Sequence, residues 1–192
     1  MTTDSTAMPF AFTICGIPEL PEHSARGITH VLSILDPGYP DLEAFGSYGE
    51  HAKLELRFHD AIDPKPGEEL PEPHHVEALL SFGRDMMAEP GDKRLLVHCH
   101  AGVSRSTAAT TLLLAQAAPE LDAAAIMAEV ARLREKAWPN LRMIEIGDAL
   151  LGRGGTLVEA VRNRHRDMAR RNPALVRFMA DAGRVREVAE FL

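Results

Sequence analysis

Short apolar runs dominate the first half of the chain and predict strands. Each run is rich in Ile, Val, Leu or Phe and is bounded by turn residues, as strands are. The four runs are Phe10–Ile17, Thr29–Leu35, Ala52–Phe58 and Leu95–Val97. The second is apolar enough to predict a buried strand. The alternation in the third predicts a strand with one covered face.

Windows with helical periodicity follow the third and fourth of these runs. They are Pro73–Met87, Thr107–Ala117, Asp122–Ala137 and Asn140–Leu151. The last two are separate helices because Pro139 cannot continue a helix. Strands that alternate with helices and then give way to a run of helices predict an α/β fold. We expect a short central, mostly parallel sheet flanked by helices.

The last 41 residues differ in pattern and in charge from the rest. Three glycines between Gly152 and Gly155 predict a flexible joint, and Thr156–Arg171 predicts an amphipathic helix with many arginines. Asn172-Pro173 ends it, and Ala174–Leu192 predicts one or two short helices. We therefore predict a main domain over residues 1–151 and a helical C-terminal extension over 152–192. The extension either packs on the domain or offers a basic docking surface.

Composition narrows the classes of protein that fit. The chain has 192 residues, two cysteines and a net charge of −7, which argues against a disulfide framework and against a general nucleic-acid binder. The first ten residues lack the basic start and apolar stretch of a signal peptide. No apolar run approaches the ~18 residues of a membrane span. We expect a cytoplasmic protein with neither nucleic acid nor membrane as a partner, and its oligomeric state stays open.

The chemistry is concentrated between Leu95 and Thr107, where the sequence is LLVHCHAGVSRST. An apolar strand leads into Cys99, a loop with Gly102, then Arg105 and a helix. The unpaired N–H groups and the dipole at a helix N-terminus attract anions, and a loop curled over that end adds further N–H donors. Arginine binds phosphate through a planar fork. Cysteines in such a field ionise readily, so we expect Cys99 to act as a nucleophile.

The segment His98–Ser106 resembles the HC-x5-R-[ST] signature of the cysteine-dependent protein tyrosine phosphatases, most closely their dual-specificity branch. The resemblance covers roughly Phe10–Leu151, so it implies that fold and a phosphatase catalytic domain over residues 1–151. It implies a phosphorylated protein as substrate, a phosphocysteine intermediate and no cofactor. The phosphate would be held by the loop residues His100, Ala101, Gly102, Val103, Ser104 and Arg105.

The resemblance also implies roles for the residues on either side of Cys99 in the signature. His98 would fix the loop through hydrogen bonds, and the Ser106 hydroxyl would assist departure of the thiolate in the second step. The general acid is expected upstream, on a loop over the site. Asp60 ends the Ala52–Phe58 strand and is our candidate. Asp63 and Asp36, which also follow strands, are the alternatives.

Several alternatives stay open at this point. The substrate could instead be a small metabolite, a nucleotide or an RNA 5′ end, or the site could bind phosphate groups without turnover. Inositide phosphatases of the superfamily that this motif resembles tend to carry lysines in the loop, so the resemblance and the absence of lysine here disfavour a polyanionic lipid. Cys15 is either a core residue or a disulfide partner for an oxidised Cys99. No metal is expected, because no carboxylate or cysteine stands at metal-ligand spacing from the clustered histidines His74, His75, His98 and His100.

Overall fold

Four parallel strands form the central sheet of the computed structural model, which describes residues 10–192. Residues 1–9, which hold most of the segment without a signal-peptide pattern, lie outside the described part. The strand order is β1-β4-β2-β3, and every pair is parallel. The strands are β1 (Ala11–Gly16), β2 (His30–Leu35), β3 (Ala52–Arg57) and β4 (Arg94–Cys99). The predicted fold class is confirmed.

Seven α-helices and three 3₁₀ segments accompany the sheet in the described residues. The 3₁₀ segments are η1 (Ile17–Arg26), η2 (Glu43–Ser47) and η3 (Ala189–Phe191). The α-helices are α1 (Pro73–Ala88), α2 (Arg105–Ala117), α3 (Ala123–Leu133), α4 (Leu141–Leu150), α5 (Thr156–Arg171), α6 (Pro173–Asp181) and α7 (Val185–Val188).

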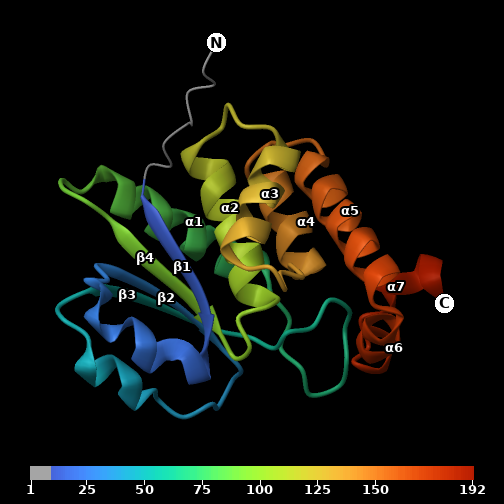
Figure 1. The fold of residues 1–192 in the computed structure, drawn as a ribbon, viewed down its shortest axis with the longest axis horizontal. Helices are drawn as coiled ribbons and strands as arrows, with labels where there is room; N and C mark the ends of the chain where they lie inside the picture. The colour runs from blue at the N-terminus through green and yellow to red at the C-terminus, as the bar shows by residue number, and fades with distance from the viewer. Residues whose placement is uncertain (1–9) are drawn as a thin grey trace.

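The two faces of the sheet are covered unequally (Figure 1). Helices α1 to α4 pack on one face and bury the larger apolar cluster, while η1 and η2 cover the other face over a smaller cluster. Burial of apolar surface stabilises both layers by roughly 25 cal/mol per Å² removed from water. The thicker layer surrounds α2, whose first eleven residues are all buried.

Helix α2 has the sheet on one side and α1, α3 and α4 around it. Small residues let these neighbours come close. A Cβ atom on Gly147 of α4 would overlap the Leu112 side chain of α2, so only glycine permits this approach. The consequence is a rigidly held helix whose N-terminus carries the Cys99–Arg105 loop.

Helix α3 is shorter than its periodicity predicts. The expected helix runs to Ala137, but α3 ends at Leu133. Arg134 leaves the helical conformation and directs its guanidinium toward Glu19 and toward the carbonyls of Ala101 and Gly102. These contacts replace the helical turn that the pattern alone predicts.

The C-terminal extension contacts the rest of the chain along its length. Leu157 and Val161 of α5 are fully buried in the larger cluster. Helices α6 and α7 contribute Val176 and Val188 to a third cluster around Trp138. Of the helices within residues 10–192, none combines the length and the apolar character that crossing a membrane requires.

We predict that Leu157→Ala lowers the free energy of unfolding by about 2–5 kcal/mol, the usual cost of deleting a buried leucine side chain. Leu150→Ala is the matched control, because Leu150 is 44% exposed, and it should change the value by less than about 0.5 kcal/mol. Urea unfolding followed by circular dichroism measures both. Equal values for the two variants would mean that α5 does not unfold with the rest of the protein.

Candidate active site

The loop that joins β4 to α2 lies at the carboxyl end of the sheet, where open α/β sheets bind ligands. It packs against the end of β1, where Ile17 N–H donates to the His100 carbonyl at 2.9 Å. Gly102 has φ of 66°, and a Cβ atom there would lie 2.6 Å from the Gly16 nitrogen. Only glycine meets both constraints.

The backbone of this loop is oriented in one direction. Its five carbonyls, from His100 to Ser104, all accept hydrogen bonds from surrounding segments. None of the five N–H groups donates to another residue in the described part of the chain. Successive N–H groups that converge in this way form a concavity suited to an anion such as phosphate.

Arg134 supports the loop from outside. It donates to the Gly102 carbonyl at 2.9 Å and to the Ala101 carbonyl at 3.2 Å. Two further bonds, 2.8 and 2.6 Å long, join it to the Glu19 carboxylate. The hydrogen bonds from Arg134 hold the pKa of Glu19 at about 2, so this pair stays charged over the physiological range. Neither residue is predictable from the sequence, because an Arg–Glu pair 115 positions apart leaves no local pattern.

Cys99 and Ser106 lie next to each other at the base of the loop. The Cys99 sulfur is 3.3 Å from the Ser106 hydroxyl, and both side chains are buried. His98 is buried as well, and burial lowers its pKa to about 4, so its ring is neutral. Its two ring nitrogens form no hydrogen bond with any described residue. The ring packs against Phe45, with ring centroids 5.5 Å apart.

The Arg105 guanidinium makes its hydrogen bonds to the protein through Nη1. Its Nη1 donates to Asp36 and to the Phe58 carbonyl, each at 2.6 Å, and the residue is only 3% exposed. Nε is buried without a partner among residues 10–192, and no hydrogen bond there involves Nη2. The Nε–Nη2 edge is therefore available for the two-point contact that arginine makes with phosphate oxygens.

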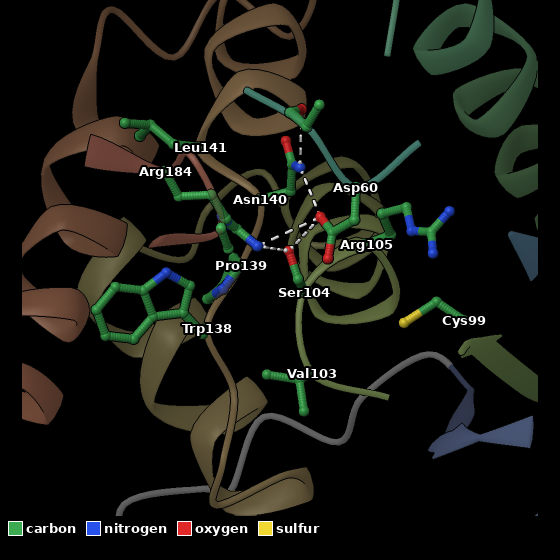
Figure 2. Close-up of polar contacts among 12 residues, drawn as sticks. Asp60, Cys99, Val103, Ser104, Arg105, Trp138, Pro139, Asn140, Leu141 and Arg184 are labelled. Carbon is green, nitrogen blue, oxygen red and sulfur yellow. Dashed lines mark hydrogen bonds and ion pairs between the residues drawn. The ribbon is translucent and has the colours of Figure 1, made fainter. Parts of the chain in front are cut away.

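Asp60 is the predicted acid that comes to the loop. Its Oδ1 accepts from the Ser104 hydroxyl at 2.7 Å, the Asn140 amide at 2.8 Å and Arg184 at 3.3 Å. Figure 2 shows these three donors converging on one carboxylate oxygen. Burial opposes ionisation, but the charges of Arg184 and Arg105 and the two hydrogen bonds lower the pKa of Asp60 below its ordinary value.

The two alternative acids lie elsewhere. Asp63 is bound by Arg186 at 2.9 Å on the exposed side of its loop. Asp36 is paired with Arg105, and its backbone N–H donates to the His100 ring at 3.2 Å. Asp36 thus supports the arginine and the loop, while Asp60 alone of the three bonds to Ser104.

Asn140 and Arg184 complete the surroundings of Asp60 and were not predicted as site residues. The sequence identifies Asn140 only as the start of a helix after Pro139, and it does cap α4 by accepting from the Met143 N–H. Arg184 is one of many arginines in the extension. Its burial is the only property that distinguishes it, and a sequence pattern does not show which arginine of so charged a segment is buried.

Cys15 faces away from this site. It pairs with His98 across the β1–β4 ladder, whereas Gly16 pairs with Cys99. Adjacent residues of a strand point to opposite faces, and Cys15 and Cys99 accordingly belong to different apolar clusters. Burial raises the pKa of Cys15 to about 12, so it is an unreactive core thiol in this fold.

Comparisons with known proteins identify the fold. No model of a known protein family matches the sequence, and no curated protein matches it. Among solved structures, human DUSP28 is 18% identical with a TM-score of 0.55, and the match covers 77% of this chain and 96% of that chain. PTPMT1 in complex with PI(5)P is 13% identical with a TM-score of 0.54, covering 74% and 91%.

A third match is the human tyrosine phosphatase-like serine/threonine/tyrosine-interacting protein, which is 20% identical with a TM-score of 0.51, covering 73% of this chain and 87% of that chain. The fold of the described residues is therefore that of the dual-specificity and tyrosine phosphatases. This is the fold that the His98–Ser106 motif implied.

We predict that mild oxidation with peroxide or diamide produces no disulfide between Cys15 and Cys99, because the two thiols lie on opposite faces of the sheet. Mass spectrometry of the non-reduced, digested protein measures this directly. Cys15→Ser is the control and should leave the oxidation rate of Cys99 unchanged. Recovery of the cross-linked peptide from folded protein would contradict the observed register.

Proposed function

We propose that the protein is a cysteine-dependent phosphatase that hydrolyses phosphotyrosine, and also phosphoserine and phosphothreonine, in protein substrates. The observation that carries the proposal is the loop backbone: five outward carbonyls with partners and five N–H groups free to face a phosphate among the described residues. Cys99 stands at one end of this loop and Arg105 at the other.

In the first step of the proposed mechanism, the Cys99 thiolate attacks phosphorus and the bond from phosphorus to the leaving oxygen breaks. The loop N–H groups and the Nε–Nη2 edge of Arg105 stabilise charge on the other phosphate oxygens. Asp60 donates a proton to the departing oxygen through Oδ2, which forms no hydrogen bond with a described residue. The products are phosphocysteine and the free phenol or alcohol.

In the second step, water replaces the dephosphorylated product. The Asp60 carboxylate takes a proton from this water, whose oxygen attacks phosphorus while the sulfur–phosphorus bond breaks. The Ser106 hydroxyl, 3.3 Å from the sulfur, donates a hydrogen bond to the departing thiolate. Inorganic phosphate leaves, Asp60 again carries a proton, and Cys99 is regenerated as the thiolate.

The loop side chains favour a protein substrate over a phosphoinositide. One structural match was solved with PI(5)P, but in this chain the variable loop positions are His100, Ala101, Val103 and Ser104, none of which is lysine or arginine. A ligand with several phosphates would find only Arg105 within the loop itself. Hydrolysis of a metabolite, a nucleotide or an RNA 5′ end is the alternative that a substrate panel distinguishes.

The proposal predicts that Cys99→Ser abolishes hydrolysis of phosphotyrosine peptides yet retains binding of tungstate, a phosphate analogue. A serine hydroxyl is a poor nucleophile near neutral pH, while the loop N–H groups are unchanged. Turnover is measured on phosphotyrosine, phosphoserine and phosphothreonine peptides, nucleotides and inositides, and binding by calorimetry. Arg105→Lys should also be severely impaired, since a point charge does not replace the fork.

Two results would overturn this proposal. Activity above a few per cent in Cys99→Ser would exclude the phosphocysteine intermediate. A wild-type protein that binds phosphopeptides but turns over none of the substrates would identify a phosphate-binding module instead of an enzyme.

Asp60→Asn should slow hydrolysis of phosphotyrosine peptides by on the order of 10²–10⁴, because the amide cannot donate the proton that the phenol needs. The loss should shrink for aryl phosphates whose leaving groups have low pKa values. Asp63→Asn is the matched control and should show neither effect beyond small changes in loop order, since Asp63 binds Arg186 and not Ser104. A uniform loss across leaving groups in Asp60→Asn would mean that Asp60 only shapes its loop.

A further inference from the structure

Arg184 reaches the site from the C-terminal extension, where it lies just before α7. The residue is 5% exposed. Its Nη1 donates to the Ser104 hydroxyl at 2.7 Å and to Asp60 Oδ1 at 3.3 Å, and its Nη2 donates to Glu187 at 2.7 Å. A single buried cation therefore links the phosphate loop, the candidate acid and the extension (Figure 2).

Glu187 binds both Arg184 and the turn that contains Asn140. Its carboxylate accepts from the Trp138 indole N–H at 2.6 Å and from the Leu141 N–H at 3.0 Å. Trp138 also stacks on His165 of α5 with ring centroids 4.1 Å apart. Asn140, the third donor to Asp60, thus stands between two residues that the extension holds in place.

The extension also holds the loop that follows Asp60. Arg186 donates to the Asp63 carboxylate at 2.9 Å and to the Ile62 carbonyl at 3.1 Å. Lys65 donates to the Ala182 carbonyl at 2.7 Å. The acid and its loop are therefore fixed from the same short stretch, residues 182–187.

We propose that Arg184 is a positioning residue for the reaction: it holds Oδ1 of Asp60 against Ser104 so that Oδ2 faces the reacting group. This inference rests on the proposed phosphatase activity. All three donors to Asp60 bind Oδ1, and the Asp60 side chain remains 33% exposed. A carboxyl group fixed through one oxygen keeps the other for proton transfer. The extension is in this sense part of the active site.

The charges around Asp60 mean that a change at Arg184 should alter the pH dependence of kcat/KM. The titratable and charged groups in and next to this cluster are Arg184, Arg105, Glu187, Cys99, His100, His165 and Asp36. The positive charge of Arg184 lowers the pKa of Asp60, so its removal raises that pKa. A general acid works in its protonated form. The alkaline limb of the kcat/KM profile must therefore move to higher pH when the charge at position 184 is removed.

The test compares three variants. Arg184→Gln removes the charge but keeps an N–H donor, and Arg184→Lys keeps the charge without the fork. Arg177→Gln is the matched control at an exposed arginine of α6. For Arg184→Gln we expect kcat/KM on phosphotyrosine peptides to fall by about tenfold to a hundredfold, less than the full contribution of a general acid. The loss should shrink with better leaving groups, and the alkaline limb should move to higher pH.

Arg184→Lys should keep the alkaline limb near its wild-type position while retaining a leaving-group-dependent loss. Arg177→Gln should leave both the limb and the leaving-group dependence unchanged. The titration of the Asp60 carboxyl carbon, followed by NMR on protein labelled with ¹³C-aspartate and assigned with Asp60→Asn, reports the same shift without turnover. It should move to higher pH in Arg184→Gln alone.

The proposal would be overturned if Arg184→Gln lowered kcat/KM equally for all leaving groups. In that case the alkaline limb of the pH profile and the titration of Asp60 would both stay at their wild-type positions. If Arg184→Gln lacks the native near-ultraviolet circular dichroism spectrum, Arg184→Lys carries the test, and a loss independent of the leaving group refutes it. Failure of the phosphatase proposal is recognised separately. In that case Cys99→Ser and wild type would be equally inactive, whereas the NMR titration would still show whether Arg184 acts on Asp60.

Discussion

The hydrogen bonds that the β4–α2 loop makes through its carbonyls determine the rest of the site. Backbone polar groups that are removed from water must find partners, or stability falls. Here η1, Arg134, the Trp138–Asn140 turn and α2 bind all five carbonyls from outside. The N–H groups are thereby directed inward. The ability of the loop to bind an anion therefore depends on the segments around it as much as on the motif.

Two buried arginines lie next to this loop, and each forms an ion pair with a carboxylate of its own. Arg105 pairs with Asp36, and Arg184 pairs with Glu187 while also contacting Asp60. A buried charge is tolerated only when its partners replace the lost hydration, and removing one partner typically costs 3–5 kcal/mol. The positive charges of both arginines also act on Asp60, and they favour its carboxylate form inside the protein.

The parts of the site that the sequence predicts are those set by local geometry. Cys99, Gly102 and Arg105 lie within one strand–loop–helix segment, whose spacing follows from backbone sterics and the helix N-terminus. The sequence places Asp60, Asp63 and Asp36 alike after strands, and the preference for Asp60 comes from the resemblance. The contact with Ser104 is what separates Asp60 from the other two in the structure. Arg184 is not predictable, because it is 124 residues from Asp60 along the chain and its neighbours in sequence carry similar charges. Only the packing of α5 to α7 against Trp138 distinguishes it. The early end of α3 has the same origin, since Arg134 serves a tertiary contact.

The position of Cys15 on the far face of the sheet has a consequence for recovery from oxidative damage. The chain contains two cysteines, so an oxidised Cys99 has no second thiol within reach to resolve a sulfenic acid. Reduction must then come from a thiol outside the chain, such as glutathione, that can enter the phosphate loop. The lifetime of the oxidised protein would depend on the size of that external thiol pool and on access to a sulfur that is only 2% exposed.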